Sequence, residues 1–247
     1  MNVAVLADVH SNLPALEAVV EDFQQRNVTH VWHLGDAIGY GAEPYACLQL
    51  LADLKAELIT GNHELAVLDA GQAMGFNSMA REAINWTRRE LSEEIRAFLE
   101  TLAQGMKPLP GVYLFHGLPG QPNGYLRTAE TAEAVFSHFE ENDPRIRIAF
   151  FGHTHRPMIF THLPGGPVRM FEPHEDLMIA PGRRYLVNPG SVGQPRNRNP
   201  FAQYLIYRPG EGRILFRRVE YNVREAQSRI IEAGLPPSLA ARLSQGL

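Results

Sequence analysis

Seven side chains of types that bind metal ions stand at the ends of short apolar runs in this sequence. They are Asp8, His10, Asp36, Asn62, His116, His153 and His155. Each run reads as a buried strand, so these side chains are expected at strand carboxyl ends, where open α/β sheets bind ligands. Buried carboxylates need a compensating cation or polar partner. The set therefore predicts a metal centre.

The ligand types narrow the choice of metal. Imidazole nitrogens combined with carboxylate and amide oxygens favour first-row divalent ions, and a set without thiolate is unlike structural zinc. Seven ligands exceed what one ion needs, so we expect two ions that share the Asp36 carboxylate. Manganese is the expected metal, with iron, zinc, nickel and cobalt as alternatives. Taken singly, each motif also reads as a cap, a turn or a surface feature, and only their joint occurrence indicates a site.

The elements that must position these side chains follow from hydrophobic periodicity. Strands are expected at residues 3–7, 28–34, 56–60, 112–115 and 146–151, and helices at 13–23 and 44–54. Their alternation near the start of the chain predicts βαβ units and a largely parallel sheet. Residues 157–219 read as antiparallel hairpins, and residues 223–247 as one or two helices.

We expect one domain over residues 1–247, with residues 65–108 as a helical insertion or cap. Residues 63–105 show no strand pattern, and Glu64 reads as part of a helix start. If the insertion covers the cleft, Phe76, Met79 or Trp86 would contact an organic group of a ligand. The favoured reading is that its arginines and glutamates form solvated ion pairs.

Composition limits the function classes. A net charge of −4 and an isoelectric point near 6.2 give no support for binding long nucleic acid or an acidic membrane. The single cysteine, Cys47, cannot form an intramolecular disulfide and is expected to be a buried small side chain. No run approaches the roughly 18 apolar residues of a membrane span, and the apolar start is too short for a signal peptide. We therefore expect a cytoplasmic protein.

In this order the motifs resemble those of the calcineurin-like metallophosphoesterase family. They stand here as Asp8-Val9-His10, Gly35-Asp36, Gly61-Asn62-His63-Glu64, His116-Gly117 and Gly152-His153-Thr154-His155. The segment Asn188–Gly193 also looks like the loop of the compact bacterial phosphodiesterase-like branch. The resemblance implies a mixed α/β fold, namely a four-layer αββα sandwich in which two mixed sheets are flanked by helices.

The resemblance also implies roles for the site residues. One ion would be held by Asp8, His10 and His155, the other by Asn62, His116 and His153, and Asp36 would bridge the two. The implied catalytic residues are His63, Asp36 and Asn62. A hydroxide between the ions would attack a phosphoester in line, and His63 would assist the leaving oxygen. The expected activity is that of a metal-dependent phosphoesterase.

One departure from the family pattern bears on the substrate. Where the phosphoprotein phosphatase branch has a phosphate-clamping arginine, this sequence has Tyr40, which favours a phosphodiester over a dianionic monoester. Arg196 and Arg198 would replace the clamp if their loop folds over the site, and otherwise form a solvated basic loop. The expected partner is a small phosphoester, with a nucleotide as one candidate.

Three alternatives remain at this point. The first is a phosphomonoesterase or phosphoprotein phosphatase. The second is an exonuclease, which neither the charge balance nor an aromatic and basic strip supports. The third is a metal-binding scaffold without catalysis, which would not need a proton donor such as His63.

Overall fold

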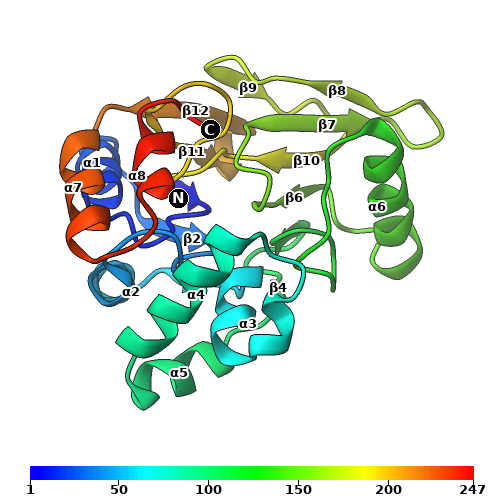
Figure 1. The fold of residues 1–247 in the computed structure, drawn as a ribbon. Helices are drawn as coiled ribbons and strands as arrows, with labels where there is room; N and C mark the ends of the chain where they lie inside the picture. Colours follow the sequence, from blue (N-terminus) through cyan, green and yellow to red (C-terminus); the bar gives the residue numbers. More distant parts are fainter.

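Two six-stranded sheets lie face to face, with helices on both outer sides (Figure 1). The computed structural model describes residues 1–247. The first sheet has the order β3-β2-β1-β11-β12-β9, and the second has the order β4-β5-β6-β10-β7-β8. Each sheet contains both parallel and antiparallel pairs. The predicted four-layer sandwich of two mixed sheets is confirmed.

The strands of the first sheet are β1 (Val3–Leu6), β2 (His30–His33), β3 (Glu57–Leu58), β9 (Asp176–Met178), β11 (Ala202–Arg208) and β12 (Arg213–Val219). Those of the second are β4 (Gly105–Met106), β5 (Val112–Phe115), β6 (Ile148–Phe150), β7 (Met158–His162), β8 (Arg169–Phe171) and β10 (Arg184–Asn188). The helices are α1 (Leu13–Gln24), α2 (Pro44–Asp53), α3 (Asn62–Leu68), α4 (Ser78–Glu90), α5 (Glu93–Glu100), α6 (Ala129–Asn142), α7 (Val223–Glu232) and α8 (Pro237–Leu243). None of them combines the length and apolar character needed to cross a bilayer.

The first strand shows how the layers are filled. Val3 and Val5 of β1 pack between the two sheets, whereas Ala4 and Leu6 face the helices that cover the first sheet. A strand buried on both faces reads as a continuous apolar run, which is why its pattern did not alternate. Asn12 then caps α1, since its Oδ1 accepts a hydrogen bond of 3.2 Å from the Ala15 amide.

The insertion differs in detail from the expected pattern. The long helical stretch is broken at Leu91, where Ser92 caps α5 with its side chain. Residues 105–106 form the short edge strand β4, although no strand was expected within residues 63–105. Pairing with β5 creates this strand, so its sequence carries no periodic signal.

Helix α6 is absent from the expected elements, yet it covers the outer face of the second sheet (Figure 1). Val135, Phe136 and Phe139 on this helix pack against Phe115 at the end of β5 and Phe151 directly after β6. This helix supplies the fourth layer.

A carboxylate of α1 ties this helix to the first sheet. Asp22 accepts hydrogen bonds from Tyr204 of β11 at 2.6 Å and from Arg217 of β12 at 2.9 and 3.1 Å, in addition to Arg26. Although burial opposes its ionisation, these donors lower the pKa of Asp22 well below its ordinary value. The ion pairs are partly solvated, which screens them.

We expect Asp22→Asn to lower the free energy of unfolding by about 1–2 kcal/mol at neutral pH, because it removes charge-assisted hydrogen bonds. A carboxyl whose pKa is depressed in the folded state stabilises above its unfolded pKa of about 3.9, and this contribution is lost as the pH falls below that value. The difference between the two proteins should therefore shrink in acid. Denaturant unfolding at several pH values measures it. Asp53→Asn, on the exposed face of α2, is the control, and an equal loss there would contradict the account.

Candidate metal centre

The predicted ligands come together at the carboxyl ends of five strands. Asp8 and His10 follow β1, Asp36 follows β2, Asn62 begins α3 after β3, His116 follows β5, and His153 and His155 follow β6. The ligand atoms form two groups. Within each group, all ligand atoms lie within 4.8 Å of one another. The first group is Asp8, His10, Asp36 and His155, and the second is Asp36, His116 and His153. Asp36 is common to both groups, as expected for a bridging carboxylate.

The orientation of three imidazoles is fixed by main-chain carbonyls. Nδ1 lies 3.1 Å from the Ile38 oxygen in His10, 2.7 Å from the Leu34 oxygen in His116 and 2.6 Å from the Gln194 oxygen in His155. A carbonyl only accepts hydrogen bonds, so each Nδ1 carries the proton. Each Nε2 therefore points into the site with its lone pair when the ring is neutral.

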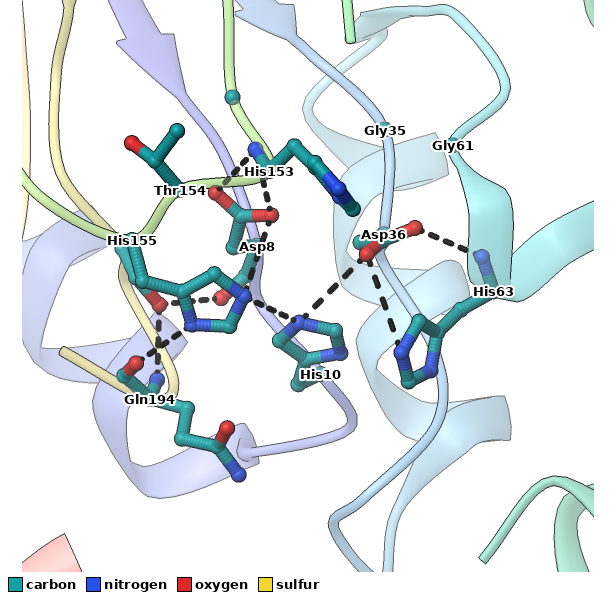
Figure 2. A network of polar contacts seen from close by, with 12 residues as sticks. Asp8, His10, Gly35, Asp36, Gly61, His63, His153, Thr154, His155 and Gln194 are labelled. Atoms are coloured by element: carbon teal, nitrogen blue, oxygen red, sulfur yellow. Dashed lines mark hydrogen bonds and ion pairs between the residues drawn. The ribbon is translucent and has the colours of Figure 1, made fainter. Parts of the chain in front are cut away.

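One close contact inside the site joins two atoms that are both acceptors in this tautomer, since Nε2 of His10 lies 3.1 Å from Nε2 of His155 (Figure 2). Nε2 of His116 lies 3.0 Å from Oδ1 of Asn62, and without an ion this contact is a hydrogen bond only while His116 carries a second proton. Nε2 of His153 is buried without any hydrogen-bond partner. A cation in each group would satisfy all of these lone pairs together, so the residues present fit two divalent ions.

Divalent ions would replace protons that the ligand side chains carry in the ion-free protein. Burial, together with the charge of Asp36, raises the pKa of Asp8 to about 8. Burial opposes protonation of His116, but the charge of Asp36 outweighs it and raises the pKa of His116 to about 9. Protons thus occupy part of the site at neutral pH when no cation balances the two buried carboxylates.

The backbone at the ligands is strained. Five of them have a positive φ in the left-handed region: Asp8 at 55°, His10 at 49°, Asp36 at 58°, His153 at 67° and His155 at 56°. Such a conformation costs about 1–3 kcal/mol for each residue and persists only where the surroundings enforce it. Concentration of this strain on the ligands is typical of a functional site.

Glu64 enforces part of this geometry without contacting the ligand atoms. Its carboxylate accepts hydrogen bonds from the amides of Asp36, Ala37, Ile38 and Gly61 at 2.7 to 3.3 Å. Burial, with the charge of Asp36, raises the pKa of Glu64 to about 7, whereas the four donors favour its ionised form. The sequence reading placed Glu64 only in a helix start. The spacing Gly-x-x-Glu predicts only the local contact with the Gly61 amide, as in a capping box, because the amides of residues 36–38 reach Glu64 through the fold.

Glycines on both sides of Asp36 leave room for this packing. A Cβ on Gly61 would lie 2.2 Å from Oδ1 of Asp36. Gly39, with φ of +86°, has no space either, since a Cβ there would lie 2.2 Å from Nδ1 of His63. Larger residues at these positions would displace the bridging carboxylate or the His63 ring.

The segment Asn188–Gly193 supports the other half of the centre. Asn188 donates to the Gly152 oxygen and to Thr154 Oγ1, which holds the turn that carries His153 and His155. Ser191 Oγ donates to the main-chain oxygen of Asp8 at 2.8 Å and accepts a hydrogen bond from the main-chain amide of Gln194 at 2.8 Å. Because the main-chain oxygen of Gln194 in turn accepts a hydrogen bond from Nδ1 of His155, this loop positions two ligands of the first group, Asp8 and His155.

His63 lies beside the centre rather than within either ligand group. Its amide donates to Asp36 Oδ1 at 2.9 Å, and its Nε2 lies 4.0 Å from Asp36 Oδ2 (Figure 2). The ring packs against Tyr40 and Phe76, with centroids 4.5 and 5.0 Å away. Nδ1 is buried without a partner, and burial lowers the pKa of His63 to about 4.

A cavity of about 540 Å³ opens onto the centre. Its walls include Gln72, Phe76 and Asn77 of the insertion on one side and Asn123 and Tyr125 on another. Of the residues predicted to contact substrate, Tyr40 and Arg196 line this cavity, whereas Arg198 lines a neighbouring one. Arg242 of α8 also reaches the cavity, and no sequence pattern indicated it.

Cation binding should release protons, because protons on Asp8 and His116 compete with the ion for the ligand atoms. With pKa values of about 8 and about 9 for these groups, we expect affinity for Mn²⁺ to rise with pH up to about pH 9. Calorimetric titration at one pH in two buffers of different ionisation enthalpy counts the protons released. An apparent enthalpy that is the same in both buffers would contradict this assignment.

Glu64→Gln should weaken Mn²⁺ binding by about 10- to 100-fold, because an amide group replaces an oxygen that accepts main-chain hydrogen bonds next to Asp36. Equilibrium dialysis of the stripped protein measures the change. Glu100→Gln, at an exposed position on α5, is the matched control and should bind like the unaltered protein. Unchanged affinity in Glu64→Gln would show that this carboxylate does not position the centre.

Comparison with known proteins agrees with this geometry. Residues 1–210 match the calcineurin-like phosphoesterase superfamily domain. The chain is 34% identical to the uncharacterized protein MJ0912 of Methanocaldococcus jannaschii over 253 residues, covering 99% of this chain and 98% of that one.

Two crystal structures share the fold over the whole chain. A metallophosphoesterase from Sphaerobacter thermophilus is 36% identical with a TM-score of 0.86, and the match covers 100% of both chains. The hypothetical protein PH1004 from Pyrococcus horikoshii is 21% identical with a TM-score of 0.81, covering 100% of this chain and 98% of that one. The chain thus belongs to the calcineurin-like phosphoesterase superfamily, whose members are metal-dependent.

Proposed function

We propose that this protein hydrolyses small phosphodiesters with the help of two divalent metal ions, of which Mn²⁺ is the expected occupant. The observation that carries the proposal is the pair of ligand groups that share Asp36, set at the floor of a cavity. When bound, the ions would supply positive charge that activates water and stabilises the phosphoryl group during attack. The remaining chemistry belongs to the side chains around them.

In this proposal Asp36 connects the metal ligands to His63, and Asn62 lines the same cavity with its Oδ1 3.0 Å from Nε2 of His116. Asp36 is the acceptor for the His63 amide and the carboxylate closest to His116, with 3.3 Å between Oδ2 and Nε2. This arrangement couples the bridging position to the residue that would act on the leaving group. Arg196 lines the same cavity, so its positive charge favours an anionic substrate there.

His63 is suited to act on the leaving oxygen because its ring lines the cavity and its Nε2 lies 4.0 Å from Oδ2 of the shared carboxylate Asp36. A pKa of about 4 makes the ring neutral near pH 7, so in the ligand-free protein it carries one proton. An anionic substrate next to the ring favours the charged form and would raise this pKa. His63 would then donate its proton as the ester bond breaks.

The preference for a diester is supported by walls on two sides of the centre. Phe76 and Asn77 come from the insertion side, and Tyr125 and Asn123 from the loop before α6. Tyr125 lies with its ring centroid 4.3 Å from that of His153. Aromatic faces and amides of this kind bind organic groups, and a diester presents one such group on each side of its phosphorus.

The experiment compares bis-p-nitrophenyl phosphate with p-nitrophenyl phosphate after the metals are stripped and Mn²⁺ is restored. We expect faster cleavage of the diester, and we expect Asp36→Asn to lower turnover by more than about 100-fold because the shared ligand is weakened. Preference for the monoester would favour the phosphatase alternative. Absence of turnover with Mn²⁺, Ni²⁺ and Zn²⁺ would favour the metal-binding scaffold.

His63→Ala should lower kcat by about 10²–10⁴-fold for a diester with an alkyl leaving group, because such a group must be protonated as it departs. The loss should be smaller for a p-nitrophenolate leaving group, which is stable as an anion. Bound metal should stay unchanged, since His63 belongs to neither ligand group. His174→Ala, at an exposed position outside this cavity, is the control. Equal losses for both leaving groups would contradict proton donation.

A further inference from the structure

Two arginines that pair with no aspartate or glutamate side chain face the cavity from the last quarter of the chain. Arg196 follows β10, and Arg242 lies on α8. Neither forms an ion pair with an aspartate or glutamate side chain. Arg196 donates to Gln194 Oε1, but its Nε is buried without a partner. Arg242 donates from Nε to the main-chain oxygen of Leu247, and its two terminal nitrogens form no hydrogen bond.

The two guanidinium groups lie close to the same aromatic ring. Their central carbons are 5.7 Å (Arg196) and 6.0 Å (Arg242) from the ring centroid of Tyr40. That ring in turn lies 4.5 Å from His63 and 4.7 Å from His10, measured between centroids. Burial, together with the charge of Arg196, lowers the pKa of Arg242. The two like charges therefore act on each other, and an anion that contacts both would relieve their repulsion.

The fold holds Arg242 in place. Leu239, Ala240 and Leu243 of α8 are buried in a cluster with Tyr40 and with Ala80 of α4. Gln227 of α7 donates to the Ala240 oxygen at 2.9 Å. The arginine is therefore carried by a packed helix and not by a loop, which suits a binding residue.

The turn after α8 is also tied to the loop that carries Arg196. The amide of Arg198 donates to the Gly246 oxygen at 2.9 Å, and Gly246 packs against Asn199. The two arginines are thus fixed relative to each other by main-chain contacts.

The arginines differ in their distance from the metal ligands. The amide of Arg196 donates to the main-chain oxygen of the metal ligand His155 at 3.1 Å, whereas Arg242 is carried by α8 and reaches the cavity beside Tyr40. Arg196 thus adjoins a metal ligand, and Arg242 enters the same cavity from a separate helix. An anion that contacts both arginines lies next to the phosphate held at the centre and is separate from it.

We propose that Arg242 and Arg196 bind a second phosphate of the substrate, carried on one of the two organic groups of the diester. This inference rests on the proposed function, because it assigns the first phosphate to the metal centre. Arg242 lies beyond residue 210, where the match to the superfamily domain ends. The second phosphate site would therefore combine one arginine of the matched domain with one from the C-terminal helices.

The kinetic test uses thymidine 5′-(p-nitrophenyl phosphate) with and without a 3′-phosphate, two diesters that differ by one phosphate group. We expect kcat/KM to be about 10- to 100-fold higher for the phosphorylated substrate, as two charge-assisted contacts would give. Arg242→Met should remove this preference and leave the plain diester within about threefold. Arg224→Met, at an exposed position on α7, should behave like the unaltered protein.

A binding test separates this inference from the proposed function. Calorimetry with the Mn²⁺-loaded protein compares thymidine 3′,5′-bisphosphate with thymidine 5′-monophosphate, and it needs no turnover. We expect tighter binding of the bisphosphate by about tenfold or more in the unaltered protein and in Arg224→Met, and a loss of this difference in Arg242→Met. If neither diester is cleaved but this binding pattern holds, the proposed function fails and the second phosphate site stands. Equal binding of both nucleotides by the unaltered protein, or an undiminished difference in Arg242→Met, would overturn the site.

Discussion

Hydrogen bonds from three imidazole Nδ1 atoms to main-chain carbonyls fix the ligand atoms of the metal centre. The Nδ1–H groups of His10, His116 and His155 donate hydrogen bonds to the main-chain oxygens of Ile38, Leu34 and Gln194, respectively. Their Nε2 atoms therefore face inward as acceptors. Two buried carboxylates, Asp8 and Asp36, face the same space. Without cations this arrangement brings lone pairs and negative charges together, and the same arrangement is favourable once divalent ions are present.

Much of the surrounding structure keeps these acceptors from moving apart. Glu64 gathers the amides around Asp36, and Ser191 joins the loop after β10 to Asp8 and Gln194. Five ligands have a left-handed backbone conformation, which is unfavourable by itself and is kept because the surrounding contacts enforce it. The two sheets provide the rigid frame, since they bring the carboxyl ends of β1, β2, β5 and β6 to one side.

The sequence could predict the centre because its signal is local. Each ligand directly follows an apolar run, so the ends of strands could be found even where their bounds were off by one or two residues, as in β2 and β3. The four-layer arrangement came from the resemblance and is confirmed by the two mixed sheets. The expected roles of individual ligands and of His63 still await experiment.

What escaped prediction depends on contacts between distant parts of the chain. Strand β4 exists only through its pairing with β5, and Arg242 reaches the cavity only because α8 packs against α4 and Tyr40. Arg198 stands two residues from Arg196 but lines another cavity, since the backbone turns at Arg198 with a φ of 62°. Glu64 was read correctly as part of a helix, yet its four amide partners come from two loops that only the fold brings together.

The most direct test of the two-ion centre is anomalous diffraction from crystals of the Mn²⁺-loaded protein. We predict two manganese peaks, one next to His10 and His155 and one next to His116 and His153, with the Asp36 carboxylate between them. A single peak, or two ions that do not share Asp36, would contradict the central claim.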